Sequence, residues 1–523
     1  MEWPETDSRT GKPATTQTAK DIWSDFCCGN DTLRQTIADC QNWRRDYMTV
    51  VQQLVAYQCQ APPEEALRMA QAGLDSMHSK FIMREMDAKK TMTTNLTIPA
   101  RQAFLPSALS QFSGFDTQTI QGTVPAPSNY YSFPLASPHG TDHTPIFIQG
   151  QDAVAQLETW KSYGCLEDSA AHHAATICTM KNISLLVKDK VFVLLGATSA
   201  MGPAKSLLAI PGARVLGIAR AGTNMKELKA WCSVHGSADA TLQTPGDGAD
   251  MLLHGPAIAQ WIIETAPANQ EIILCHLAYM DGEAHVRITV AMDMITQYVT
   301  SQYNGKVTLG FLSSPATVHS IPAEAVHEAK TRYNSKPTWE SIAGIVSLGK
   351  WLQPTHVWDN GGLLNGLAHL QGPNYALAKT AQQWRCMVAY WNDGQTVSAP
   401  HAPPTRTDSM VRYNTIATVL EGMQSFEPMI SFDVLPTSSL MTAILLYQIT
   451  EETSVCRPIN KAALTHPLQV MWDGSVHGGS WRCPYTTESA GTLAFLLGKT
   501  MSAPYKPLKS LAARPTNEQD EKV

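Results

Sequence analysis

The first residues that could do chemistry form a glycine-rich turn. An apolar run from Val191 to Leu195 leads into the seven residues GATSAMG at 196–202, and residues 203–208 are compatible with a helix. In such a strand–turn–helix unit, free backbone amides and the positive end of the helix point at a phosphate group. Gly196 would permit the tight turn, and Gly202 the close packing of helix on strand. We therefore expect a dinucleotide pyrophosphate to bind at Gly196, Thr198, Ser199, Ala200, Met201 and Gly202.

A second apolar run follows the turn and indicates which dinucleotide binds. It begins at Ala213 and ends at Arg220. The residue after the second strand of a dinucleotide site faces the adenosine ribose, where a carboxylate would bind the 2′-hydroxyl and an arginine favours a 2′-phosphate. Arg220 therefore predicts NADP(H) in preference to NAD(H). The alternative is an ordinary solvated surface arginine.

These residues need a parallel sheet to position them. From Leu186 onward, short apolar runs alternate with amphipathic stretches, a pattern typical of βαβ units covered by helices on both faces. The sequence therefore predicts an α/β fold with a doubly wound parallel sheet, that is, a Rossmann-like fold. We expect its strands at Val191–Leu195, Arg214–Ile218, Glu271–Leu274, Lys306–Phe311, Thr396–Ala399 and Leu468–Trp472.

The first 182 residues have a different character. Apolar residues at helical spacing predict amphipathic helices over 30–58 and 63–88, separated by two prolines. We expect them to pack on each other or on the main domain; the alternative is a docking face for a partner helix. Residues 93 to about 146 are rich in proline, serine and glycine and predict a connector, and residues 150–182 look helical. The expected organisation is an N-terminal helical region (1–92), a connector and helix (93–182), a Rossmann-like domain (183–510) with an insertion (318–370), and a tail (511–523).

Composition narrows the classes of function. The chain has 523 residues, a formal net charge of −6 and 44% hydrophobic residues, which is typical of a soluble globular protein. The negative charge gives no reason to expect nucleic acid or an anionic membrane as a partner, and no apolar run is long enough to span a bilayer. Eleven dispersed cysteines without a CxxC pair, and a polar N-terminus, predict reduced thiols in the cytoplasm. His139 and His143 have no third ligand nearby, so we predict no metal site.

Five segments, in order along the chain, resemble the short-chain dehydrogenase/reductase family. The turn GATSAMG is similar to the family's GASxGIG turn, with Ala200 at the middle glycine. NYALAK at 374–379 resembles its YxxxK pair, and Leu312-Ser313-Ser314 closes a strand where the family places its catalytic serine. APPTRTD at 402–408 resembles the APGxxxT loop over the nicotinamide, and LQVMWDG at 468–474 its final strand. The resemblance implies further cofactor contacts from Pro403 and Thr405, and a dimer or tetramer.

The chemistry of carbonyl reduction requires such a set of side chains. The oxygen must gain a proton while the carbon gains hydride, and a tyrosine with its ordinary pKa near 10 exchanges protons poorly at neutral pH. A lysine four residues along a helix lies on the same face and would lower that pKa. We expect Tyr375 to be the general acid/base, Lys379 its electrostatic partner and ribose clamp, and Ser314 (or Ser313) the residue that orients the substrate. The alternative is an ordinary pair on a helix surface.

The sequence also departs from the family pattern. Ser314 and Tyr375 are 61 residues apart (375 − 314), which implies that residues 318–370 form a lid or substrate-recognition insert; the alternative is a remote decoration. The NAG motif is replaced by His276-Leu277-Ala278, and residues 288–300 contain no asparagine for a proton relay.

Two functions remain open after these departures. The first is an NADP(H)-dependent oxidoreductase that reduces a carbonyl or oxidises the corresponding alcohol. The insert, and a fainter resemblance to the ketoreductase domains of fatty-acid synthases, favour a bulky or acyl-thioester substrate. The second is a non-catalytic protein that keeps the fold for cofactor sensing or assembly. A serine hydrolase is excluded because the chain has no GxSxG elbow.

Overall fold

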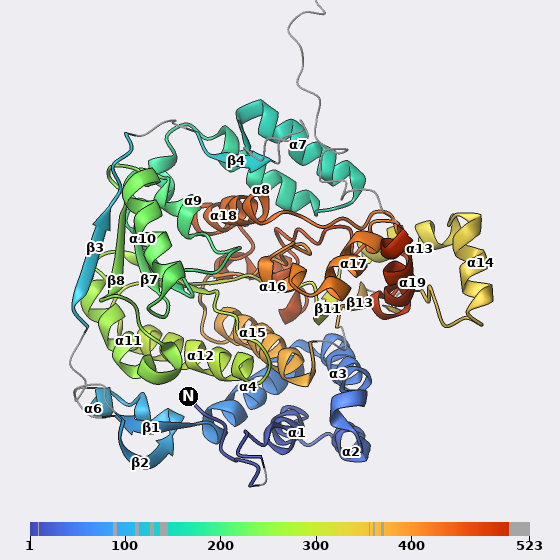
Figure 1. Cartoon of the computed structure of the whole chain (residues 1–523), viewed down its shortest axis with the longest axis horizontal. Helices are drawn as coiled ribbons and strands as arrows, with labels where there is room; N and C mark the ends of the chain where they lie inside the picture. Colours follow the sequence, from blue (N-terminus) through green and yellow to red (C-terminus); the bar gives the residue numbers. More distant parts are fainter. Residues whose placement is uncertain are drawn as a thin grey trace, which may run out of the picture.

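The centre of the protein is a seven-stranded sheet with the strand order β14-β10-β9-β6-β7-β8-β3 (Figure 1). The computed structural model describes residues 1–8, 10–86, 92–109, 115–125, 130–135, 145–354, 356–358, 361–367 and 371–500. Six neighbouring strands are parallel, and only β3 pairs antiparallel, on β8. In chain order the parallel strands run 3-2-1-4-5-6, the arrangement of a Rossmann fold. The strands are β3 (Thr117–Gln121), β6 (Lys190–Leu195), β7 (Arg214–Ile218), β8 (Thr241–Pro245), β9 (Glu271–His276), β10 (Val307–Phe311) and β14 (Val397–Ser398).

Helices cover both faces of this sheet, as the alternation of side chains along β6 requires. Val191 and Val193 point into one hydrophobic cluster, and Phe192 and Leu194 into the other. The first cluster contains α11 (Met251–Thr265), α12 (Ala284–Gln302) and α15 (Pro373–Trp391). The second contains α9 (Ala204–Leu208), α10 (Thr223–His235) and α18 (Val434–Thr450). The predicted doubly wound α/β fold is therefore confirmed.

The N-terminal helices belong to the first cluster. They are α1 (Thr15–Phe26), α2 (Asp31–Asp39), α3 (Trp43–Gln60) and α4 (Pro63–Lys80), followed by β1 (Ile82–Met86), β2 (Met92–Pro99), α5 (Ala100–Ala103) and α6 (Pro106–Leu109). Trp384 of α15 packs against Trp23 and Phe26 of α1, with ring centroids 5.4 and 4.9 Å away. A Cβ on Gly73 of α4 would lie 2.5 Å from the Trp384 ring, so the two helices are in intimate contact. Of the two helices predicted here, 30–58 is broken into α2 and α3, and the second ends at residue 80 rather than 88.

Other elements differ from expectation for local reasons. The final strand predicted at Leu468–Trp472 is wrong: it is the 3-10 helix η3 (Pro467–Met471), which begins at a proline and is capped by the His466 side chain. The helix predicted over 150–182 is α7 (Gly150–Tyr163) and α8 (Asp168–Thr179), separated by left-handed Gly164. Strands β3 and β8 were not predicted. The remaining short elements here are β4 (Ser132–Leu135), β5 (Ile146–Gln149), η1 (Ile183–Leu186) and η2 (Pro458–Ala463).

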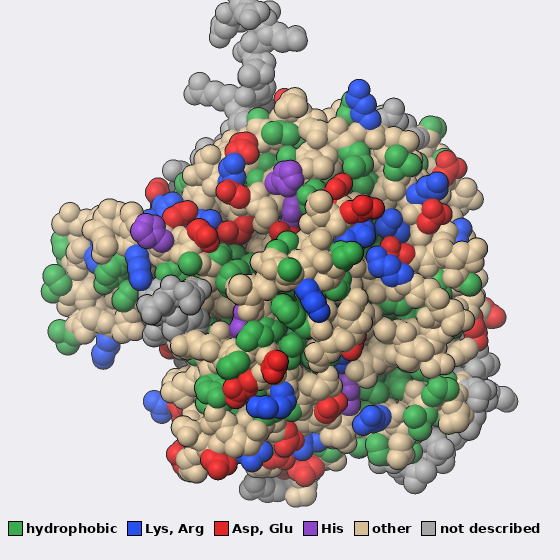
Figure 2. Space-filling model, turned by 180° about the vertical axis from the view of Figure 1, so that it is seen from behind, with side chains coloured by type: hydrophobic (Ala, Val, Ile, Leu, Met, Phe, Trp, Pro, Cys, Tyr) green, Lys and Arg blue, Asp and Glu red, His purple; other side chains and the backbone are tan. Residues whose placement is uncertain are grey.

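The insert between Ser314 and Tyr375 forms a lobe of its own. It contains β11 (Val318–Ile321), α13 (Ala323–Asn334), α14 (Thr338–Val346), β12 (His356–Trp358) and β13 (Gly361–Asn365), with an antiparallel sheet in the order β11-β13-β12. Its helices protrude from the body of the molecule (Figures 1 and 2). The lobe packs on the C-terminal helices α17 (Asn414–Met423) and α19 (Thr487–Thr500) through a small hydrophobic cluster that includes Tyr333 and Phe426; the short helix α16 (Asp408–Val411) precedes α17.

The predicted domain boundaries stay a prediction, although two observations bear on how the segments join. The N-terminal helices share one hydrophobic cluster with the sheet, and β3, from the predicted connector, is an edge strand of that sheet. The predicted tail lies outside the described residues. Among the described residues, no helix is long and apolar enough to cross a membrane.

Candidate active site

The structure brings Ser314 and Tyr375 together across the insert. Tyr375 lies in the first turn of α15, which starts with Pro373 after a left-handed Gly372 (φ +79°). Ser314 follows β10, and its Oγ is 2.7 Å from the Tyr375 Oη. The neighbouring Ser313 instead donates to the Ala399 carbonyl at 3.0 Å and so holds β10 beside β14. Of the two serines left open by the sequence, Ser314 is the one at the site.

Burial sets the protonation state of Tyr375. The side chain is almost fully enclosed, and burial raises its pKa to about 12, although the hydrogen bond with Ser314 acts in the opposite direction. The phenol therefore carries its proton at neutral pH. Burial thus makes the phenol a weaker acid than an ordinary tyrosine, the opposite of the lowered pKa expected from Lys379.

Lys379 lies one helical turn beyond Tyr375 on α15, as predicted. Its Nζ donates a hydrogen bond to Gln382 Oε1 at 3.1 Å, and burial lowers its pKa to about 8. Among the described residues, no hydrogen bond joins Lys379 to Tyr375. Its expected roles as electrostatic partner and ribose clamp stay predictions.

Two further residues at the site, His285 and Tyr279, were missed by the sequence reasoning. The His285 ring, in the first turn of α12, stacks on the Tyr375 ring with centroids 5.4 Å apart and planes at 23°. Tyr279 lies over His285 at 4.8 Å and over Tyr375 at 6.4 Å. No motif marks them, because the rings meet only when the carboxyl ends of β9 and β10 come together.

His285 presents an unpaired hydrogen-bond donor. Burial, and then the charge of Lys379, hold its pKa well below the usual range, so the ring is neutral. Its Nδ1 faces the Met280 amide at 3.5 Å and so acts as an acceptor, which places the proton on Nε2. That Nε2 is buried and has no hydrogen-bond partner among the described residues. A bound oxygen atom would satisfy it.

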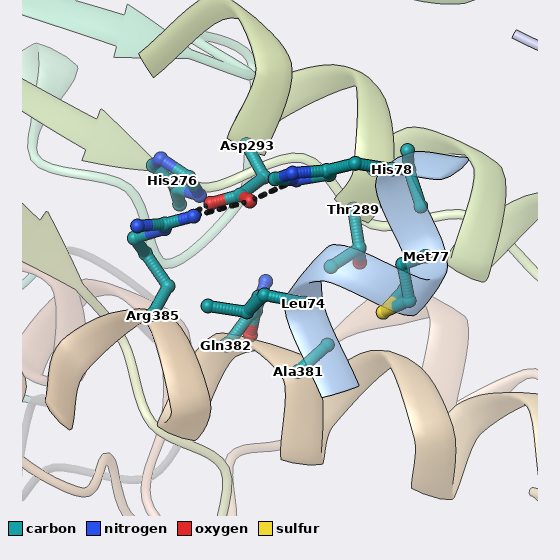
Figure 3. A pocket seen from close by; sticks show the side chains of 10 residues that line it. Leu74, Met77, His78, His276, Thr289, Asp293, Ala381, Gln382 and Arg385 are labelled. Carbon is teal, nitrogen blue, oxygen red and sulfur yellow. Dashed lines mark hydrogen bonds and ion pairs between the residues drawn. The ribbon is translucent and has the colours of Figure 1, made fainter. Parts of the chain in front are cut away.

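A buried charge network holds the site helices in place (Figure 3). Asp293 of α12 accepts from Arg385 of α15 at 2.6 and 2.9 Å, and lies 2.6 Å from Nε2 of His78 on α4. Burial would raise the Asp293 pKa, but Arg385 and His78 hold it well below the usual range. His276, which stands where the family has its NAG motif, is 2.6 Å from the Thr296 hydroxyl beside a cavity of about 10 Å³, room for one water molecule.

The glycine turn has the expected backbone shape. Gly196 has φ +107°, and a Cβ there would lie 2.4 Å from the Ala278 amide nitrogen, so only glycine fits. The Gly196 and Ala197 amides both donate to the Ile218 carbonyl, which fixes the turn on β7. At Gly202, a Cβ would lie 3.1 Å from the Ser199 carbonyl oxygen, so its closest contact is within the turn itself.

Part of the turn remains available to a ligand. The Ser199 and Gly202 amides bond within the turn, whereas those of Thr198, Ala200 and Met201 make no hydrogen bond in the described part of the chain. All three residues are partly or fully exposed. Three free amides on an accessible turn fit a phosphate. The helix that follows, α9, has only five residues, so the amides rather than a long helix dipole would carry the binding.

Of the remaining predicted cofactor residues, Arg220 is exposed, whereas Pro403 and Thr405 are buried. Arg220 is exposed at the carboxyl end of β7 and makes no hydrogen bond or ion pair with another described residue. Pro403 and Thr405 are buried in the loop after β14. The Thr405 hydroxyl donates to the Pro403 carbonyl at 2.9 Å and lies 3.0 Å from the Thr437 hydroxyl, so its hydrogen bonds are made within the protein.

The turn and the Ser314–Tyr375 pair share one edge of the sheet. A cavity of about 20 Å³ lies beside the turn; its lining includes Met201 of the turn, Leu277 after β9, Leu312 before Ser314, and Pro400 after β14, but neither Ser314 nor Tyr375. Ligands of open α/β sheets bind at the carboxyl ends of the strands, where all of these residues lie.

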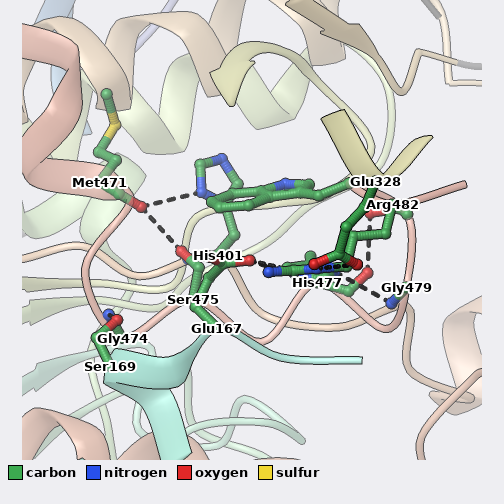
Figure 4. Close-up of polar contacts among 12 residues, drawn as sticks. Glu167, Ser169, Glu328, His401, Met471, Gly474, Ser475, His477, Gly479 and Arg482 are labelled. Carbon is green, nitrogen blue, oxygen red and sulfur yellow. Dashed lines mark hydrogen bonds and ion pairs between the residues drawn. The ribbon is translucent and has the colours of Figure 1, made fainter. Parts of the chain in front are cut away.

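A cluster of aromatic rings lies around His401, which follows β14 at the same edge of the sheet (Figure 4). His401, which follows β14, stacks on His319 of the insert at 4.1 Å, and the Trp481 indole donates to His319 Nε2 at 3.0 Å. His477 stacks on Trp481 at 4.8 Å and lies 2.9 Å from a carboxylate oxygen of Glu167. The cluster therefore ties the insert and the C-terminal segment to the strand beside Ser314.

Arg482 completes this cluster and neutralises its carboxylates. It pairs with Glu167 and, through Nε at 2.9 Å, with Glu328 of α13. Burial raises the Glu167 pKa, but His477 and Arg482 overcome this and lower it to about 2. His139 and His143 lie outside the described residues.

No protein-family model matches the chain, and no curated protein matches it.

Proposed function

We propose that this protein is an NADP(H)-dependent oxidoreductase of the short-chain dehydrogenase/reductase type that reduces a carbonyl. The observation that carries the proposal is the 2.7 Å contact between Ser314 and Tyr375, formed across a 61-residue separation at the edge that also holds the glycine turn. An ordinary surface tyrosine has no reason to be buried against a serine at that edge.

The residues would divide the work as follows. The nicotinamide, when bound, would supply hydride to the carbonyl carbon. The Tyr375 Oη would give its proton to the carbonyl oxygen as the carbon–oxygen π pair moves onto that oxygen, and Ser314 would fix the angle of approach. The unpaired Nε2 proton of His285 would offer a second donor. The free amides of the turn and Arg220 would hold the pyrophosphate and the 2′-phosphate.

The finer expectations belong to the same proposal. They are a bulky or acyl-thioester substrate, a cytoplasmic location, and assembly as a homo-oligomer.

A second candidate, a non-catalytic protein that keeps the fold for cofactor sensing or assembly, is favoured by one observation. Lys379 bonds to Gln382 rather than to Tyr375, so the tyrosine lacks the cation expected beside it.

Cofactor binding tests the proposal first. Fluorescence titration with NADPH and NADH should show tighter binding of NADPH, loss of binding in Gly202→Asp, and weaker binding of NADPH in Arg220→Ala. A subsequent screen of carbonyl substrates, with Tyr375→Phe beside the wild type, separates the two candidates: cofactor binding without turnover would favour the second. If neither cofactor binds, the oxidoreductase proposal is wrong and a structural or assembly role on the same fold is favoured.

A further inference from the structure

The outer face of α14 in the insert is apolar and uncovered by any described residue. Trp339, Ile342, Ile345, Val346 and Leu348 are 40%, 55%, 75%, 70% and 87% exposed. They lie at the end of the protruding lobe, where Figure 2 shows hydrophobic side chains along the outer edge. We call residues 338–350 the apolar tip. Exposed apolar side chains gathered in one place indicate a binding surface, whereas scattered ones do not.

Contacts on the other side of α14 fix which face points outward. Glu340 is buried, and its carboxylate accepts a hydrogen bond from the Tyr485 hydroxyl. Trp339, which is 40% exposed, lies at the border of the two faces, with its ring 5.9 Å from that of Phe426. The helix is therefore docked on the C-terminal cluster by one side, and the exposure of Ile345, Val346 and Leu348 is a fixed property of the fold.

The two charged residues that flank the apolar tip along the chain are both lysines. Lys336 precedes α14, with its ammonium 3.5 Å from the centre of the Tyr333 ring, and Lys350 follows the helix and is exposed. The single acidic residue between them is the buried Glu340. The tip therefore offers apolar side chains framed by two cations.

The apolar side chains and the two flanking lysines distinguish between two possible partners of the tip, a second copy of this chain and a lipid bilayer. If a second copy paired its α14 antiparallel with this one, Lys336 would face Lys350 of the other copy. Five apolar residues are also far fewer than the roughly 20–30 residues per side of a standard protein interface. A bilayer has neither problem, because its acyl boundary accepts apolar side chains while its phosphates pair with flanking lysines.

We propose that the apolar tip docks the protein on an anionic lipid surface. The net charge of −6 does not oppose this, because it averages over the whole molecule, whereas docking depends on charges within about 10 Å of the membrane. The proposal does not depend on the oxidoreductase function.

Co-sedimentation of the full chain with vesicles tests the proposal. The probes are vesicles of phosphatidylcholine with phosphatidylglycerol, and of phosphatidylcholine alone. Wild type should bind the anionic vesicles, and the triple variant Ile345→Ser/Val346→Ser/Leu348→Ser should lose about tenfold or more of its partitioning. The matched control is Ile459→Ser on η2, an equally exposed residue at 85%, which should bind like wild type.

Two further measurements make the test decisive. Lys336→Ala/Lys350→Ala should reduce the preference for anionic over neutral vesicles by about tenfold. Light scattering and thermal unfolding of every variant show whether assembly or folding has changed. The proposal is overturned if the wild type stays in solution with both vesicles, if the triple variant binds as well as the wild type, or if the triple substitution instead dissociates a dimer.

Discussion

Burial raises the pKa of Tyr375 to about 12, further above neutrality than that of an ordinary tyrosine. A phenol with a pKa of about 12 donates a proton to a developing alkoxide, but it is a poor base at neutral pH. If the proposed function holds, Tyr375 would act as a proton donor rather than as a base at neutral pH.

The two adjacent serines provide a matched pair for testing this site. Tyr375→Phe should lower kcat/KM for carbonyl reduction by about 10²–10⁴-fold, because it removes the proton donor, and should leave NADPH binding intact. Ser314→Ala should lower it by a smaller factor, because it removes the orienting contact. Ser313→Ala removes a hydrogen bond to the Ala399 carbonyl. It should lower the free energy of unfolding and leave kcat/KM nearly unchanged. Equal effects of the two serine substitutions on kcat/KM would contradict the assignment of Ser314.

Lys379 should give the reaction a basic limb in its pH profile. Burial lowers its pKa from the ordinary 10.5 to about 8, so the ammonium is present below pH 8 and is lost as the pH rises through that value. If the charge assists catalysis, kcat/KM for reduction should be level at neutral pH and decline above about pH 8. Lys379→Arg keeps a charge at all accessible pH values and should abolish the decline. A decline that persists in this variant would belong to another group.

His285 should show a trade between activity and stability. His285→Phe keeps an aromatic ring against Tyr375 but removes the unpaired Nε2 donor. We expect kcat/KM to fall by about 10–100-fold, because a donor to the substrate oxygen is lost. The free energy of unfolding should be unchanged or higher, because an unsatisfied buried polar group is removed. A fall in both quantities, measured by kinetics and by urea unfolding, would indicate a purely structural role.

Among the elements, the turn after β6 depends most closely on one residue. Gly196→Ala forces a side chain into φ +107° and places its Cβ 2.4 Å from the Ala278 amide nitrogen. Gly212 has a comparable φ of +80° but nothing within 4 Å of a Cβ, so it is the control. Gly212→Ala should cost about 1 kcal/mol of unfolding free energy from backbone strain alone. Gly196→Ala should cost several-fold more and weaken NADPH binding; similar losses in the two variants would show that the contact with Ala278 is relieved cheaply.

The elements that could be predicted are those whose side chains are apolar on both faces. β6, β7, β9 and β10 are such strands, and each lies close to the predicted range. β3 (TQTIQ) is an edge strand and β8 (TLQTP) lies next to it; both are largely polar, so neither contains an apolar run that would predict a strand. The apolar run LQVM at 468–471 predicts a strand. It forms a 3-10 helix instead, because Pro467 precedes it and the His466 side chain caps it.

The candidate site could be predicted only in part from the sequence. Tyr375 and Lys379 are four residues apart in a helix, and this spacing is visible in the sequence. The choice between Ser313 and Ser314 depends on which hydroxyl turns toward β14, which no spacing reveals. The stacking of His285 on Tyr375 joins residues 90 positions apart (375 − 285) and has no local signature.

For the molecule as a whole, buried neutral histidines make stability sensitive to acid. Burial lowers the pKa values of His173, His276 and His401 to about 4, against an ordinary value of 6.5. Below about pH 6.5 the unfolded chain binds protons that the folded chain does not. The free energy of unfolding should therefore be full above that pH and fall steadily toward pH 4.

Urea unfolding across this pH range checks the expectation. His401→Gln should make the decline shallower by about one proton's contribution, and its control, His327→Gln at an exposed position, should not change the slope. A wild-type stability that is flat between roughly pH 7 and pH 4.5 would contradict the assignment of neutral, buried rings.

The packing of α4 and α1 against α15 has a consequence for how the chain is made. The helix that covers Trp23 and Phe26 lies about 350 residues later in the sequence (373 − 26 = 347), and synthesis proceeds at about 5–20 residues per second. The N-terminal helices must therefore wait some tens of seconds on the ribosome with their apolar faces bare. During that interval they would rely on one another, or on a chaperone, to remain soluble until their final partner emerges.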